Sequence, residues 1–354
     1  MTEAAVRAAL GRVVDPEIRR PITELDMVRE VVVDGGAATV GIALTIIGCP
    51  AADTIERDVR AAVLGVPGVS SLDLTVGVMT VPEREALVAR LRGTRTSQFG
   101  PDTLTKIYAV TSGKGGVGKS TLTANLAVAL AARGLKVGLV DADVFGFSIP
   151  GILGLGPDDR PTKVGDLMMP PTGHGVQVIS IGMFVDGSTA VSWRGPLLHR
   201  TIQQFLTDVW FGDLDVLLLD LPPGTGDVAI SIGQLLPHAE VLVVTTPQPA
   251  AAEVAERSGL VARQTGQAVI GVIENMTGDL FGSGGGDAVA SRLDVPVLAR
   301  IPLSRPLREG GDAGAPVVLA DPADPAAAAI LSLADTLAAR GRDLPRRPLP
   351  FTAG

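Results

Sequence analysis

From Thr105 onward the chain alternates short apolar runs with longer stretches of helical spacing, and this alternation restricts the fold more than any other feature. Several of the runs are apolar at every position, which is typical of parallel strands covered by helices on both faces. The pattern predicts a doubly wound α/β domain with a mostly parallel sheet over residues 105–340. The predicted strands are 107–111, 137–140, 176–181, 216–219, 241–244, 269–273 and 297–301.

The first 93 residues predict a separate, small α+β domain. Helical spacing and strand alternation follow one another in the order αββαβ. Residues 94–104 are polar, contain Gly and Pro, and are expected to be a linker, whereas 341–354 hold three prolines and are expected to be a loose tail. The predicted elements of the small domain are helices at 4–13 and 51–64 and strands at 28–33, 38–46 and 72–79.

Composition excludes several classes of protein. The formal net charge of −8 over 354 residues argues against a nucleic-acid coat, which needs a basic face. No apolar run reaches the ~18 residues of a spanning helix, and the acidic start does not resemble a secretory signal, so we expect a cytoplasmic protein with neither membrane nor nucleic acid as partner. The single cysteine, Cys49, excludes a disulfide or a four-thiolate metal site within one chain.

A glycine-rich stretch, Ser112–Thr121, follows a predicted strand and opens a predicted helix. Its glycines allow backbone N–H groups to wrap an anion, and the helix N-terminus adds positive potential. The spacing fits the Walker A pattern, which predicts that Lys119 contacts the β- and γ-phosphates and that Ser120 ligates Mg²⁺. The predicted nucleotide-binding residues of this loop are Gly113, Lys114, Gly115, Gly116, Val117, Gly118, Lys119, Ser120 and Thr121.

Acidic residues follow two of the predicted strands. Asp141 and Asp143 come after 137–140, and Asp220 ends the strand 216–219 in the manner of a Walker B carboxylate that reaches Mg²⁺ through water. Two aspartates at i and i+2 on an extended segment face opposite ways, so Asp141 and Asp143 are expected to do different jobs. Gly224 could turn an N–H toward a γ-phosphate and so sense hydrolysis.

Lys114, directly after the first glycine, is the mark of a deviant Walker A loop, and here the chain resembles the family of MinD, ParA and the nitrogenase iron protein. The resemblance implies a homodimer in which Lys114 reaches the partner's phosphates and contributes to catalysis together with Lys119. It also implies that Asp143 positions the attacking water and that Asp141 lies nearer the Mg²⁺. By the same resemblance Asn275 reads the adenine base, although a plain turn asparagine fits its position nearly as well.

Longer segments narrow the resemblance to the Mrp/ApbC-type ATPases, the bacterial iron–sulfur cluster carriers. The N-terminal domain resembles one found in iron–sulfur assembly factors, through 15–17 and 45–50. The resemblance implies Mg²⁺ and ATP as cofactor and substrate, slow hydrolysis, and apoprotein clients or iron–sulfur assembly factors as partners. The segments that carry it are DADVFGFSIPGILG (141–154), SWRGPLLHR (192–200), LDVLLLDLPPGTGD (214–227), ENM (274–276), FGSGGG (281–286) and IPLSRPLREGGDAGAP (301–316).

The chain departs from that family where cluster ligands are concerned. The carriers usually place a Cys-x-x-Cys pair shortly after Glu-Asn-Met, and the segment Met276–Gly284 has no cysteine. Cys49 is the only thiol that could hold a cluster. Its place before Pro50 and a predicted helix start could lower its pKa and make it reactive, and a buried, inert cysteine is the alternative.

Three functions stay open from the sequence. The chain could be an ATP-hydrolysing dimer that handles clusters, a nucleotide switch that positions cargo in the manner of ParA or MinD, or a scaffold that recruits clients without a cluster of its own. The whole-chain resemblance and Cys49 favour the first, and the missing cysteine pair favours the third.

Overall fold

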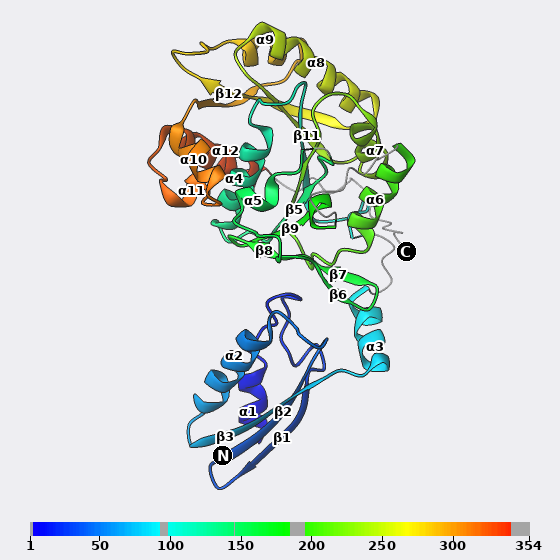
Figure 1. Cartoon of the computed structure of the whole chain (residues 1–354), viewed down its shortest axis with the longest axis vertical. Helices are drawn as coiled ribbons and strands as arrows, with labels where there is room; N and C mark the ends of the chain where they lie inside the picture. Colours follow the sequence, from blue (N-terminus) through cyan, green and yellow to red (C-terminus); the bar gives the residue numbers. More distant parts are fainter. Residues whose placement is uncertain (1–2, 93–97, 145, 185–194, 341–354) are drawn as a thin grey trace, which may run out of the picture. The chain divides into compact units, whose positions relative to one another are not determined.

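The computed structural model describes residues 3–92, 98–144, 146–184 and 195–340 (Figure 1). The predicted tail, the first part of the predicted linker and the start of the 192–200 segment lie outside these ranges. Contacts divide the chain into two units. The smaller contains residues up to 96 together with 161–170 and 208–212, and the larger contains 97–160, 171–207 and the remainder from 213.

The small unit has a three-stranded sheet in the order β1-β2-β3, with β1 and β2 antiparallel and β2 and β3 parallel. The helices and strands run in the predicted αββαβ order, and a further helix, α3, follows. Their bounds are α1 (Glu3–Leu10), β1 (Val28–Asp34), β2 (Ala37–Leu44), α2 (Ala52–Leu64), β3 (Ser71–Val78) and α3 (Val81–Arg92).

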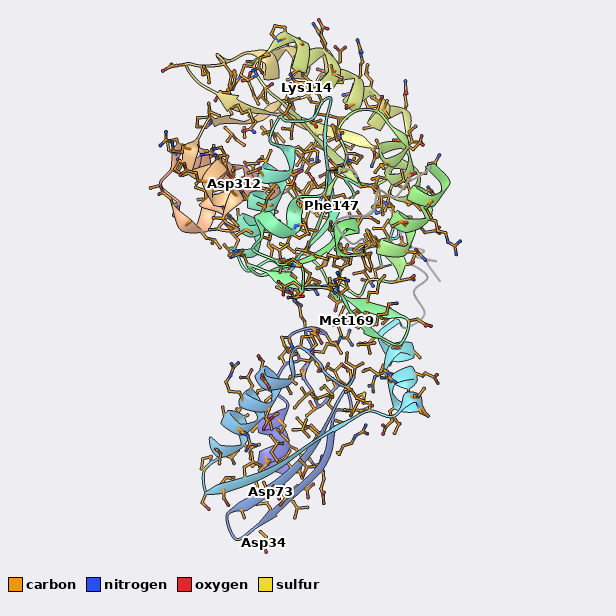
Figure 2. All side chains as sticks on the ribbon, in the orientation of Figure 1. Asp34, Asp73, Lys114, Phe147, Met169 and Asp312 are labelled. Carbon is orange, nitrogen blue, oxygen red and sulfur yellow. The ribbon has the colours of Figure 1, made fainter. Side chains whose placement is uncertain are left out.

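The core of the small unit takes in side chains from two later segments of the chain. A short antiparallel hairpin, β6 (Thr162–Val164) and β7 (Leu167–Met169), contributes three buried apolar residues, and Met169 is labelled in Figure 2. Trp210 is the fourth contribution and is 7% exposed. Both segments lie within the 105–340 range predicted for the larger domain, and neither carries a long periodic pattern that would indicate a different partner.

The large unit contains an eight-stranded sheet in the order β13-β12-β11-β4-β10-β5-β9-β8. Neighbouring strands are parallel except for β8 and β9, so the predicted doubly wound α/β class is confirmed. All seven apolar runs form strands: β4 (Lys106–Ser112), β5 (Val137–Asp141), β9 (Val176–Ser180), β10 (Val216–Asp220), β11 (Glu240–Thr245), β12 (Ala268–Thr277) and β13 (Val297–Pro302), with β8 (Thr172–Gly173) at the edge.

Helices cover the sheet in two groups that pack among themselves (Figure 1). The first group is α4 (Lys119–Ala131), α5 (Ile149–Ile152), α10 (Arg305–Asp312), α11 (Val317–Ala320) and α12 (Pro325–Ala339). The second is α6 (Gly195–Thr207), α7 (Asp227–Leu235), α8 (Pro249–Gln264) and α9 (Gly285–Leu293). None of the helices that the structure describes is long and apolar enough to cross a membrane.

The register of the central strands positions the site. Asp220 of β10 is paired with Val110 of β4 on one side and with Asp141 of β5 on the other. Because the three strands are parallel, their carboxyl ends meet at the same edge of the sheet, where open α/β sheets bind ligands. The loop after β4 therefore lies beside the acids that end β5 and β10.

Candidate functional site: a phosphate-binding loop

The loop between β4 and α4 has the geometry of a phosphate-binding loop. Helix α4 begins at Lys119, and its N-cap residue, Gly118, has a left-handed backbone with φ of 79°. A Cβ at Gly118 would lie 2.4 Å from the side-chain nitrogen of Asn275, and one at Gly113 would lie 2.2 Å from the backbone carbonyl carbon of Val254 in α8. Both positions therefore require glycine, Gly118 also for its φ.

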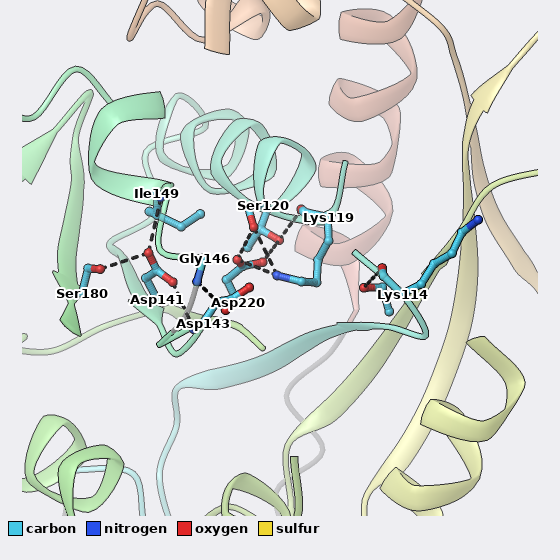
Figure 3. A network of polar contacts seen from close by, with 11 residues as sticks. Lys114, Lys119, Ser120, Asp141, Asp143, Gly146, Ile149, Ser180 and Asp220 are labelled. Carbon is cyan, nitrogen blue, oxygen red and sulfur yellow. Dashed lines mark hydrogen bonds and ion pairs between the residues drawn. The ribbon is translucent and has the colours of Figure 1, made fainter. Parts of the chain in front are cut away.

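Four side chains from two elements form a buried polar cluster at the start of α4 (Figure 3). Lys119 Nζ donates to Asp220 Oδ2 over 2.7 Å, and Ser120 Oγ donates to the same oxygen over 2.5 Å. Thr123 Oγ1 donates to Asp220 Oδ1 over 2.9 Å. The Asp220 side chain is 0% exposed and that of Lys119 is 5% exposed, so the carboxylate is compensated by one cation and two hydroxyls.

A pocket of about 710 Å³ lies over this loop. Its walls come from the phosphate loop, from the start of α6 and from the segment that follows β10. Asp143 belongs to the lining, and Asp141 does not. The lining residues are Ser112, Lys114, Gly115, Gly116, Val117, Gly118, Lys119, Ser120, Thr121, Asp143, Gly146, Leu198, Pro222, Pro223, Gly226, Asp227 and Val228.

Asp141 and Asp143 lie in different environments, as their spacing predicts. Asp143 Oδ1 accepts a hydrogen bond from the N–H of Gly146 over 3.0 Å. Asp141 is fully buried and accepts from Ser180 Oγ over 3.0 Å and from the N–H groups of Asp143 and Ile149. Burial, with the charge of nearby Asp220 second, raises the pKa of Asp141 to about 7. Protein donors thus surround Asp141, whereas Asp143 faces the pocket.

One backbone N–H and one side-chain amide donate hydrogen bonds to carbonyl groups of the loop. The N–H of Gly224, which has φ of 93°, donates to the carbonyl of Ser112 over 2.7 Å. Asn275 Nδ2 donates to the carbonyl of Val117 over 2.8 Å, and Asn275 is 4% exposed. Asn275 is therefore a support of the loop, and base recognition by it stays a prediction.

Lys114 behaves differently from Lys119. Its side chain is exposed, and Figure 3 shows it directed away from the Lys119–Asp220 pair. Among the described residues the structure gives its ammonium group no ion pair, which leaves one charge beside the pocket without a protein counter-ion.

Cys49 lies in the small unit, and of the two alternatives that the sequence leaves open the structure favours the buried thiol, whose pKa is not lowered. The thiol is 5% exposed, and its Sγ donates to Glu17 Oε2 over 3.5 Å. Burial, together with the negative charge of Glu17, raises the pKa of Cys49 to about 12. Helix α2 begins only at Ala52. Burial and the carboxylate, which comes from 32 residues away, together outweigh the backbone hydrogen bond at Ala51 that lowers the pKa of the thiol.

Sequence reasoning missed three residues of the site. Thr123 stands one turn after Lys119 on the same face of α4, and this spacing was a usable signal. Glu274 is 0% exposed, and its Oε1 accepts the N–H groups of Gly284 and Gly286 over 2.7 Å and 3.0 Å. A charged residue directly after the apolar run 269–273 was a weak signal for it. Ser258, in the middle of α8, carried no signal.

The donor atoms suit a hard cation. Ser120 Oγ and the two Asp220 oxygens are all oxygen donors, and Mg²⁺ is commonly held by one or two carboxylates with water and substrate phosphates completing its shell. Within the described residues no group of three or more His, Cys, Asp or Glu side chains could hold a metal ion by itself. A magnesium site here thus depends on the phosphates of a nucleotide.

The loop, the buried lysine and the strand-end acids on a doubly wound sheet define a P-loop NTPase. Residues 103–338 match the family described as NUBPL iron-transfer P-loop NTPase, and residues 3–74 match an iron–sulfur cluster assembly protein family. The chain belongs to the iron-transfer P-loop NTPase family, within which it is similar along its whole length to proteins named iron–sulfur cluster carrier protein.

Relatives named as carriers support this family, and two solved nucleotide-binding proteins are similar to this chain in sequence and fold. The carrier protein of Mycobacterium bovis is 53% identical over 96% of this chain and 94% of its own length, and that of Synechocystis is 38% identical over 96% and 98%. A nucleotide-binding protein of Archaeoglobus fulgidus, solved with ADP, is 34% identical over 61% of this chain and 92% of its own, with a TM-score of 0.52. MinD of Pyrococcus horikoshii, solved with Mg-ADP, is 29% identical over 66% and 96%, with a TM-score of 0.54.

Proposed function

We propose that this protein is a homodimeric, Mg²⁺-dependent ATPase that hydrolyses ATP slowly and serves iron–sulfur cluster transfer to apoprotein clients. The observation that carries the ATPase proposal is the buried Lys119–Asp220 pair, which lies directly under the loop and beside a pocket lined by Asp143. The carrier name of the relatives and the family of the chain support the cluster part.

The residues divide the work of phosphoryl transfer among them. Backbone N–H groups of the loop and the start of α4 bind the phosphates, and Lys119 neutralises charge on the β- and γ-phosphates. Ser120, with Asp220 through water, would hold Mg²⁺, which when bound offsets phosphate charge. Asp143 orients the attacking water, and the N–H of Gly224 turns to the γ-phosphate. Asn275 contributes to base recognition while it supports the loop.

Two substitutions and one control test the ATPase proposal. Lys119→Ala removes the cation at the transferred phosphate and should lower turnover by at least ~10²-fold. Asp143→Ala should lower turnover similarly but leave nucleotide affinity within about threefold. Lys136→Ala, at an exposed lysine outside the pocket, is the matched control and should resemble the parent. Phosphate release with and without Mg²⁺ measures all four proteins, and equal rates in all of them would refute the assignment.

The proposal of a homodimer is based on Lys114. A cation with no ion pair among the residues that the structure describes, next to a phosphate pocket, is suited to phosphates presented across an interface. It should favour the ATP-bound pair because that state carries the γ-phosphate charge. Sedimentation in an Asp143→Ala background should show more dimer with ATP than with ADP. Lys114→Ala should remove that difference. A Lys114→Ala protein that matches the parent in both assembly and turnover would contradict this role.

Cluster binding by this chain alone is proposed to be weak and labile. A [4Fe–4S] cluster usually takes four thiolates, whereas a dimer offers two copies of Cys49, each buried and held as a thiol beside Glu17. Clusters would then be shared with a client's cysteines or a small thiol. Anaerobic reconstitution should give iron that chelators remove and that Cys49→Ser abolishes. A chelator-resistant cluster retained in Cys49→Ser would overturn this reading.

The same observation favours a second candidate function. If no iron binds under any condition, the protein acts as a nucleotide-switched scaffold for clients, with the ATPase chemistry unchanged. The discriminating measurement is iron content after reconstitution in the presence of a cysteine-bearing client. Iron that appears only with the client supports shared ligation, and its absence supports the scaffold.

A further inference from the structure

Ser258 of α8 lies where three backbone carbonyl groups converge. Its Oγ is 3.3 Å from the carbonyl oxygen of Ser112 and 3.3 Å from that of Gly224. The carbonyl oxygen of Val254, one helical turn earlier, is farther, at 3.5 Å. A serine in a helix usually donates to that preceding turn, so the shorter approaches to the phosphate loop and to the segment after β10 are a feature of this site.

The surroundings of Ser258 are tightly packed. Ser258 is 4% exposed, and α8 is packed so closely on the start of the phosphate loop that a Cβ at Gly113 would lie 2.2 Å from the carbonyl carbon of Val254. This packing therefore holds the Ser258 hydroxyl close to the Ser112 carbonyl, whichever way the Gly224 peptide is turned.

The Ser112 carbonyl has two donors within reach, the Gly224 N–H and the Ser258 hydroxyl. The Ser112 carbonyl already accepts the N–H of Gly224 over 2.7 Å. The Ser258 hydroxyl has a single proton and can donate to only one carbonyl at a time. If the Gly224 N–H turns to a γ-phosphate, the Ser112 carbonyl loses its nearer donor, and the Ser258 hydroxyl is already within reach to replace it.

We propose that Ser258 is a positioning residue for the γ-phosphate response: its hydroxyl takes over the Ser112 carbonyl when the Gly224 N–H leaves it. The proposal rests on the function proposed above, because it requires that Gly224 responds to ATP and not to ADP. No covalent step is involved. One hydrogen bond is exchanged for another, so the buried carbonyl stays paired in both arrangements.

Loss of the Ser258 hydroxyl should weaken the binding of ATP and not that of ADP. A buried carbonyl left without a donor disfavours the state that contains it by enough to change an equilibrium about tenfold. Without the Ser258 hydroxyl, that penalty falls only on the arrangement in which Gly224 has turned. ADP, which has no γ-phosphate, leaves the Gly224–Ser112 hydrogen bond in place and should not incur it.

The test compares affinities for ADP and for a non-hydrolysable ATP analogue in the full chain by calorimetry. Ser258→Ala and the near-isosteric Ser258→Cys, which is a weak donor, should each weaken analogue binding about 5- to 10-fold and ADP binding less than twofold. Ser258→Thr keeps the hydroxyl and should restore the parent ratio. Ser231→Ala, at a serine of α7 that is 6% exposed, is the matched control.

Each outcome has a distinct meaning. Equal weakening of both ligands in Ser258→Ala and Ser258→Cys indicates a structural role only and overturns the proposal. An unchanged affinity ratio in both variants overturns it as well. A parent protein that binds neither nucleotide refutes the proposed function itself, whereas a parent that binds and hydrolyses ATP while Ser258→Cys keeps the parent ratio refutes only the role of Ser258.

Discussion

Alkylation of Cys49 should be far slower in the folded chain than in the denatured one. With a pKa of about 12, roughly one thiol in 10⁴ is ionised at pH 8, against about a quarter of the thiols at an ordinary pKa of ~8.5. The ionised fraction therefore falls by roughly 10³-fold. A thiolate of high pKa is intrinsically more nucleophilic, and this offsets part of the decrease in rate. The expected slowing is therefore about 10²-fold, and the limited access of the reagent to the buried thiol should slow the reaction further.

The assay is simple because the chain holds one cysteine. Iodoacetamide is added at pH 8 to the folded protein and to the same protein in urea, and the mass of the intact chain is followed with time. The folded rate should also rise about tenfold per pH unit through pH 10, whereas the denatured rate levels off near pH 9. Glu17→Gln should accelerate the folded reaction, since it removes the carboxylate that opposes ionisation. A folded rate within tenfold of the denatured rate would falsify the assignment of Cys49 as a protonated, shielded thiol.

Two further predictions concern stability. Gly118→Ala should lower the free energy of unfolding by about 2–4 kcal/mol, because Gly118 has a left-handed backbone and the new Cβ would collide with Asn275. In an Asn275→Ala background the same substitution should cost less, by more than ~1 kcal/mol. Urea denaturation measures both losses, and losses that simply add would contradict the contact. Trp210→Ala should cost about 3–5 kcal/mol, because it empties a buried site in the small unit and removes the ring beneath Arg20; a loss under ~1 kcal/mol in the same assay would argue against its place in the core.

Much of the large unit was predictable because its signals are local. Strands apolar at every position, separated by helical stretches, dictate a parallel sheet, and the shared edge of parallel strands then brings Asp220 and Asp141 together. The phosphate loop was recognisable for the same reason, since a strand, a glycine-rich turn and a helix are contiguous in the chain.

The remaining features depend on tertiary contacts that no local pattern encodes. The raised pKa of Cys49 comes from its burial and then from Glu17, which is distant in sequence and adjacent only after folding. The three-residue strands β6 and β7 are too short to show a hydrophobic period, so the sequence pattern does not indicate that they are buried in the small unit. Ser258 looks like any serine in a helix until α8 is packed against the loop.

The interleaving of the two units determines how this protein can be divided. The chain passes from one unit to the other at 96–97, 160–161, 170–171, 207–208 and 212–213. A protease that cuts once near residue 100 would therefore leave both halves joined through the buried hairpin and Trp210. The interleaving also limits exchange of the small unit between proteins. A gene fragment that ends before the phosphate loop encodes the small sheet without part of its core, so such an exchange requires matching changes within the sequence of the P-loop NTPase unit.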